Sequence, residues 1–107
     1  MEVYDQAHAL ARSLKESQVY RKFLEDKEKV EQDPGAREML QDYQDFLKTI
    51  QEKYMKGEEV SKEEEEKNEK LKKVILLNPL IKDYFEAEHR LGVVLMEIQK
   101  IISEAIM

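Results

Sequence analysis

Two dipeptides, Asp33-Pro34 and Asn78-Pro79, constrain the fold of this chain more than any other feature. Each places a helix-capping residue before a proline. Proline fixes φ near the helical value and lacks an N–H, so it suits the first position of a helix. The Asp or Asn side chain can accept a hydrogen bond from an otherwise unpaired donor of the first turn. We therefore predict that the two longest helices begin at Pro34 and Pro79.

The composition supports a chain built from helices. Its 107 residues contain only 3 glycines and 2 prolines, which leaves few breaks for many short strands, and 39% of the residues are charged. A disordered chain can be equally charged, but its apolar residues have no reason to keep helical spacing, as they do in this chain. We predict one all-α domain over residues 1–107, with four to five amphipathic helices, a long antiparallel hairpin and a long C-terminal helix.

The N-terminal third carries two amphipathic stretches. Val3, Ala7, Leu10, Ala11 and Leu14 share one face of a helix over about 2–14, and a second stretch runs from Ser17 to about Gln32. No glycine or proline separates the two stretches. They are either two helices or one kinked helix, and Ser17, a plausible N-cap, favours a break weakly.

A helical hairpin is predicted in the middle of the chain. Gly57 suits the left-handed position that ends the helix from Pro34, and Ser61 with Glu64 forms a capping box that starts the next one. The join at 57–60 is short, so the two helices should be antiparallel. Residues 62–70 contain no apolar side chain and should project into solvent. Asn78-Pro79 then either starts a new helix or makes a kink or tight corner, and its place in a short join favours the latter.

The last segment, 79 to about 106, has the broadest apolar stripe. It is wider than one partner helix needs, so we expect the segment to pack on two sides, one of which would be a second subunit. The predicted core or dimer-interface residues are Leu80, Ile81, Tyr84, Phe85, Leu91, Val94, Leu95, Ile98, Ile101 and Ile102. The predicted helix-cap residues are Asp33, Pro34, Ser61, Glu64, Asn78 and Pro79.

The residue types do not assemble a catalytic, cofactor-binding or metal site, and we predict none. The chain has no cysteine, and His8 and His89 are its two histidines. Glu86-x-x-His89 occurs once, whereas a di-iron bundle repeats that motif on two helices. Serines near predicted helix ends are explained by capping, and there is no glycine-rich phosphate loop. No enzyme activity, cofactor or small-molecule substrate is therefore indicated.

The charge pattern bears on partners. The net charge is −6 and lysine and arginine alternate with glutamate, so direct binding to nucleic acid is not favoured. Residues 58–70 carry seven acidic and three basic side chains, which most simply make a solvated helix face and alternatively bind a cation or a basic partner. We expect no membrane span and no signal peptide. The absence of cysteine suits a reducing cytoplasm.

A family resemblance covers nearly the whole chain, and its most specific part surrounds Asn78-Pro79. The residues that carry it are Val3-Tyr4-Asp5-Gln6-Ala7-His8-Ala9-Leu10-Ala11, Leu14-Lys15-Glu16-Ser17, Tyr20, Asp33-Pro34-Gly35-Ala36 and Leu77-Asn78-Pro79-Leu80-Ile81-Lys82-Asp83-Tyr84-Phe85-Glu86-Ala87-Glu88. They resemble the YlbF/YmcA family of small helical bacterial proteins, and its short, cysteine-free YheA-type members most of all.

The resemblance implies an all-helical, commonly dimeric, cytoplasmic protein with a regulatory role in Gram-positive bacteria. Better-known relatives influence competence, sporulation and biofilm formation through RNA processing, and their cysteines ligate iron–sulfur clusters. This chain has no cysteine, so the cluster does not carry over. The family implies no catalytic residues.

Three functions follow as hypotheses. The first is a non-catalytic regulatory adaptor that works as a homodimer through contacts with other proteins. The second is an RNA-processing accessory factor that touches RNA through Arg12, Lys15, Arg21, Lys22 and Lys29, gathered on one face. The third is a coiled-coil, chaperone-like module that clamps unfolded clients.

Overall fold

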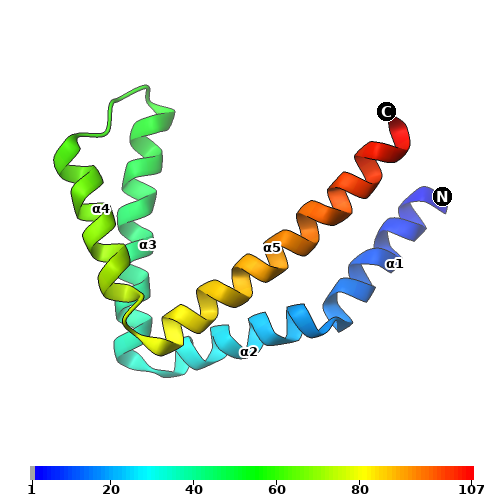
Figure 1. Cartoon of the computed structure of the whole chain (residues 1–107), viewed down its shortest axis with the longest axis horizontal. Helices are drawn as coiled ribbons and strands as arrows, with labels where there is room; N and C mark the ends of the chain where they lie inside the picture. The colour runs from blue at the N-terminus through cyan, green and yellow to red at the C-terminus, as the bar shows by residue number, and fades with distance from the viewer. Residues whose placement is uncertain (1) are drawn as a thin grey trace. The chain divides into compact units, whose positions relative to one another are not determined.

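The computed structural model describes residues 2–107, which form five α-helices and no strand (Figure 1). The helices are α1 (Glu2–Glu16), α2 (Gln18–Gln32), α3 (Pro34–Met55), α4 (Lys62–Ile75) and α5 (Pro79–Ile106). The predicted all-α class, with a helical hairpin and a long last helix, is confirmed.

Ser17 separates the first two helices. Its hydroxyl donates to the carbonyl of Leu14 at 2.6 Å, and the same oxygen accepts from the backbone N–H of Tyr20 at 3.2 Å. One side chain thus binds the last turn of α1 and caps the first turn of α2. The two stretches are separate helices, as the serine suggested.

Both cap–proline pairs start a helix. The Asp33 carboxylate accepts from the N–H of Ala36 at 2.9 Å, and α3 begins at Pro34. The Asn78 side-chain oxygen accepts from the N–H of Leu80 at 3.0 Å and α5 begins at Pro79. Because α4 already ends at Ile75, the alternative of one continuous kinked helix is wrong, and residues 76–78 form a tight corner between two helices.

The chain forms two compact units. Unit 1 comprises residues up to Glu28 together with Tyr84–Met107, and unit 2 comprises Lys29–Asp83. The long helices α2 and α5 each contribute to both units. That the whole chain is one domain stays a prediction.

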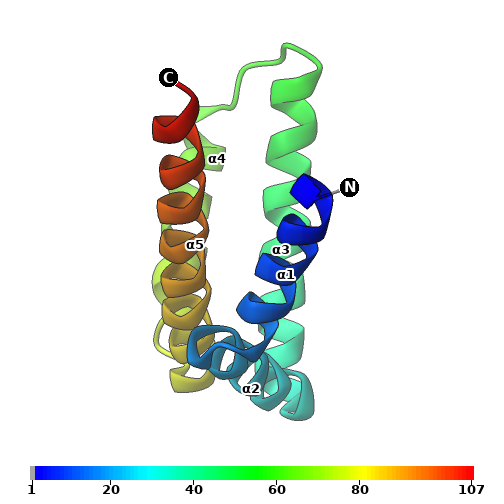
Figure 2. The same cartoon turned by 90° about the vertical axis from the view of Figure 1, so that its right-hand side faces the viewer.

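Unit 2 is the α3–α4 hairpin with the adjoining ends of α2 and α5. The two hairpin helices lie side by side and run in opposite directions in Figures 1 and 2. Gly57 has φ 74°. The N–H of Gly57 bonds to Tyr54 and that of Glu58 to Lys53, which is the Schellman pattern that closes a helix C-terminus. The buried apolar residues of unit 2 are Val30, Ala36, Leu40, Tyr43, Ile75 and Ile81.

The polar start of α4 lies along α3 through polar and cation–aromatic contacts. The Tyr43 hydroxyl donates to Asn68 at 3.2 Å, Lys53 Nζ lies 2.5 Å from Glu64 Oε1, and Lys67 Nζ lies 5.1 Å from the centre of the Phe46 ring. The prediction that residues 62–70 simply project into solvent is therefore incomplete. One side of this stretch faces α3, because polar side chains also join helices when their partners are in reach.

Unit 1 contains α1, most of α2 and most of α5. The rings of Phe23 on α2 and Tyr84 on α5 stack with centroids 5.7 Å apart and an interplanar angle of 29°. Tyr84, Ala87 and Asp26 are the buried residues of this unit, and α1 contains none. Unit 1 therefore has a small aromatic core near Tyr84 and much uncovered helix surface.

Candidate interaction surface

One face of α5 in unit 1 carries a continuous set of large aliphatic side chains. We call it the α5 face and define it by Leu91, Val94, Leu95, Ile98, Ile101 and Ile102. At 100° per residue, these positions fall within about a third of the helix circumference. Successive members are one or three positions apart, so they form a continuous stripe over three turns.

The stripe is covered at its beginning and uncovered at its end. Tyr84, which precedes the α5 face, is only 7% exposed. Leu91, Val94 and Ile98 are half-buried, whereas Leu95, Ile102 and Ile101 are 48%, 54% and 67% exposed. The same apolar pattern thus changes from core to surface along one helix, because the aromatic packing against α2 is confined to the start of the stripe.

The ten predicted interface residues divide accordingly. Ile81 is fully buried in unit 2 and Tyr84 is buried in unit 1. Leu80 and Phe85 are half-buried. The other six make up the α5 face. That this face contacts a second subunit stays a prediction.

A second exposed apolar stripe lies on α1 in the same unit. Val3 is 70% exposed, Leu10 is exposed and Leu14 is half-buried, although their spacing places them on one helix face. The predicted interface omitted these residues. The signal was present in the sequence as a regular apolar spacing, but spacing alone does not show whether a stripe will be covered.

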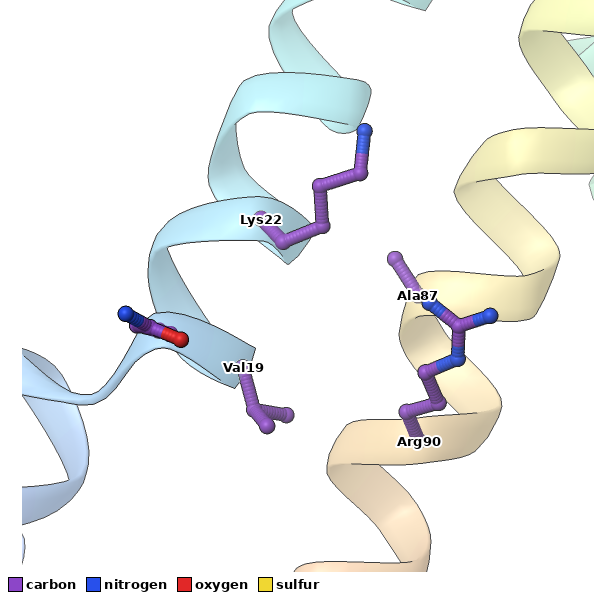
Figure 3. A pocket seen from close by; sticks show the side chains of 5 residues that line it. Val19, Lys22, Ala87 and Arg90 are labelled. Atoms are coloured by element: carbon purple, nitrogen blue, oxygen red, sulfur yellow. The ribbon is translucent and has the colours of Figure 1, made fainter.

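A small pocket of about 200 Å³ opens between α2 and α5 within unit 1. Figure 3 shows Val19 and Lys22 on α2 facing Ala87 and Arg90 on α5. Lys22 Nζ lies 2.9 Å from Asp26 Oδ1, and the Asp26 side chain is 2% exposed. No local sequence motif predicts this pocket, because its walls come from two helices that are far apart in the sequence.

Glu64, in the acidic run 58–70, is paired with Lys53 of α3. The hydrogen bond from Lys53 lowers the pKa of this carboxyl below its usual range, and the backbone N–H of Ser61 adds to the effect. Glu64 also completes the predicted capping box: its N–H bonds to Ser61 Oγ at 3.1 Å and its carboxylate accepts from the Ser61 N–H at 3.3 Å. Part of the acidic run therefore serves the hairpin itself.

His8 lies on α1 and His89 on α5, and both are exposed. Within residues 2–107, no three His, Asp or Glu side chains are grouped so that they could hold a metal ion. None of the helices described for these residues combines the length and the apolar character that crossing a bilayer requires.

These features define a small all-helical protein that leaves apolar helix faces uncovered. Residues 3–107 match the family model described as "Control of competence regulator ComK, YlbF/YmcA", and the chain belongs to this family. The resemblance inferred from the sequence is confirmed.

Two curated relatives are similar to this chain over most of their own length. A UPF0342 protein of Symbiobacterium thermophilum is 40% identical over 97% of this chain and 93% of its own length. A UPF0342 protein of Halothermothrix orenii is 42% identical over 95% of this chain and 86% of its own length.

A solved structure shares the fold. It is described as a protein of unknown function (DUF964) from Bacillus stearothermophilus, and it aligns with a TM-score of 0.95 at 20% identity, over 99% of this chain and 93% of that one. At this identity the likeness supports the helical architecture and nothing finer.

Proposed function

We propose that this protein is a non-catalytic regulatory adaptor that acts as a homodimer through protein–protein contacts in the cytoplasm. The observation that carries the proposal is the exposed part of the α5 face, where Leu95 lies about two turns before Ile101 and Ile102 on the same side of the helix. The family description, control of a competence regulator, supports a regulatory role, and its wording names no reaction.

The physical reason is the cost of leaving such a stripe in water. Scattered exposed apolar residues are ordinary, but contiguous ones mark interaction surfaces. Burying a Leu or Ile side chain contributes about 1.5–3 kcal/mol, so three such residues supply a substantial driving force for association. A second copy is always available to cover the face, and a two-fold pairing brings the same apolar patch together from both subunits.

The non-catalytic part of the proposal follows from the roles of the polar side chains. Ser17 and Ser61 are engaged at helix ends, and Thr49 donates to the carbonyl of Asp45 in its own helix. His8 and His89 lie exposed on α1 and α5. A nucleophile needs a positioned base within hydrogen-bond reach, whereas Ser17, Ser61 and Thr49 are bonded within their own helix ends or helix.

The dimer is tested by sedimentation equilibrium at micromolar concentration. Wild-type protein should sediment as a dimer and Leu95→Glu as a helical monomer, because a buried unpaired carboxylate opposes association. The matched control is Met96→Glu, which adds the same charge one position along at a side chain that is 71% exposed and lies off the α5 face. A monomeric wild type, or a Leu95→Glu variant that dimerises like wild type, contradicts the proposal.

The regulatory role is tested in a bacterium that carries the gene, with a reporter driven by the competence regulator. Deleting the gene should change reporter output, and Met96→Glu should restore it while Leu95→Glu does not. Unchanged output after deletion, or equal rescue by both variants at equal protein level, contradicts a regulatory role that depends on the α5 face.

A further inference from the structure

We infer that the pocket between α2 and α5 in unit 1 is a carboxylate-binding site that takes a glutamate side chain from a partner protein. The site is carried by the pocket itself and by two cationic side chains that line it, Lys22 and Arg90. Only the claim that the glutamate comes from a partner protein rests on the proposed adaptor function. The binding of a carboxylate is tested independently of the dimer.

The charge of the pocket is positive in an acidic protein. Lys22 is held by the buried carboxylate of Asp26, with Nζ and Oδ1 2.9 Å apart, so this pair is close to neutral. Arg90 adds a second, uncompensated positive charge to the lining. Within residues 2–107, the Arg90 guanidinium has no hydrogen-bond or ion-pair partner, and Glu86, one turn earlier on α5, does not pair with it.

Asp26 has a positioning role in this arrangement. Its side chain is 2% exposed, and one of its two carboxylate oxygens is bonded to Lys22, while Oδ2 is buried with no hydrogen-bond partner. A buried carboxylate with one bonded oxygen keeps its cation close, because losing Lys22 would leave the negative charge unpaired. The Lys22 ammonium is thereby held on Asp26, while the Lys22 side chain lines the pocket and is still 47% exposed.

The other lining residues are Gln18, Val19 and Ala87, of which Val19 and Ala87 are apolar. Val19 on α2 and Ala87 on α5 face one another across the pocket, and Arg90 runs alongside Ala87 (Figure 3). A ligand that suits these walls has a short hydrocarbon stem and ends in an anion. Arginine forms paired, planar hydrogen bonds to carboxylates, which fits Arg90 to that anionic end.

The pocket volume suits a small ligand group. About 200 Å³ is below the range of pockets that hold drug-sized ligands or cofactors, but it holds a single side chain. Glutamate has two methylene groups followed by a carboxylate, which match the apolar Val19 and Ala87 and the uncompensated charge of Arg90. On an adaptor, such a pocket would anchor one acidic residue of a docked helix or loop.

The test is a titration of the full-length ¹⁵N-labelled protein with N-acetyl-glutamate N-methylamide, followed by the backbone amides of Val19 and Ala87. The glutamine analogue is the uncharged control, and sodium chloride at equal ionic strength is the control for screening. Saturable shifts with the glutamate compound alone are expected. Arg90→Gln should weaken binding about tenfold, since one charge-assisted hydrogen-bonding partner is lost.

Arg12→Gln is the matched variant, because it removes the same charge from exposed α1 outside the pocket. It should bind as wild type does. Shifts that do not saturate, that also occur with the glutamine analogue, or that persist equally in Arg90→Gln would overturn the site. Saturable binding of butyrate without binding of the glutamate compound would contradict the claim that the ligand is a glutamate side chain of a protein. A monomeric protein that still binds the glutamate compound refutes the dimer and leaves this site standing.

Discussion

Glu64 shows how one side chain can join local and tertiary structure. It completes the capping box with Ser61 at the start of α4 and pairs with Lys53 on α3. The capping box is readable in the sequence because its two members are three positions apart. The ion pair is not, because it depends on which turn of α3 lies opposite the start of α4.

Lowering the pH should reduce the stability of the α3–α4 hairpin, because Glu64 becomes protonated. The pKa of Glu64 is lowered from 4.5 in the folded chain, chiefly by the hydrogen bond from Lys53, so the folded state favours the ionised carboxylate. Its stabilisation is present above pH 4.5 and is lost as the pH falls through the folded pKa. Urea unfolding of Glu64→Gln at about pH 7 and about pH 3 should therefore show a smaller acid-induced loss than wild type.

The control for this titration is Glu65→Gln, since Glu65 lies in the same first turn of α4. It should lose as much stability on acidification as wild type does. Equal losses in wild type and Glu64→Gln would contradict the assigned role.

At the scale of the helices, local chemistry sets most boundaries. Asp33-Pro34, Ser61 with Glu64, and Gly57 all act where the sequence predicted, because caps and turns depend on residues within a few positions of each other. The corner at Asn78-Pro79 was less certain from sequence. A proline inside a helical pattern is compatible with a kink or a restart, and here the Asn78 side chain caps a new helix.

Two glycines should respond to alanine with opposite signs. Gly57 has φ 74°, a conformation that costs an L-residue about 1–2 kcal/mol, so Gly57→Ala should destabilise the hairpin. Gly92 lies within α5 and a Cβ there would meet nothing within 4 Å, so Gly92→Ala should stabilise the helix by up to about 1 kcal/mol. Urea unfolding measures both, and changes of the same sign would contradict these assignments.

At the scale of the whole molecule, the small buried core leaves association as the expected source of added stability. Unit 1 has three buried residues and unit 2 has six. Short chains with small cores often depend on oligomerisation for stability. The α5 face and the α1 stripe are the surfaces on which such stabilisation would act.

If the protein is a homodimer, its thermal stability should depend on its concentration. A 100-fold increase should raise the Tm by about 5 °C, because mass action favours the associated state. Leu95→Glu should melt at a lower temperature that does not change with concentration, while Met96→Glu should behave like wild type. A constant Tm for wild type over this range would contradict a dimer linked to folding.

By itself the sequence determined the helical class, most of the helix boundaries and the hairpin turn. These features arise from residues only a few positions apart, whose hydrogen bonds and backbone preferences act within one helix end. The tertiary structure decided which apolar residues are covered. Tyr84 and Leu95 belong to one stripe, yet only Tyr84 is buried, because Phe23 from a distant helix packs against it. The same dependence on distant partners formed the pocket between Lys22 and Arg90.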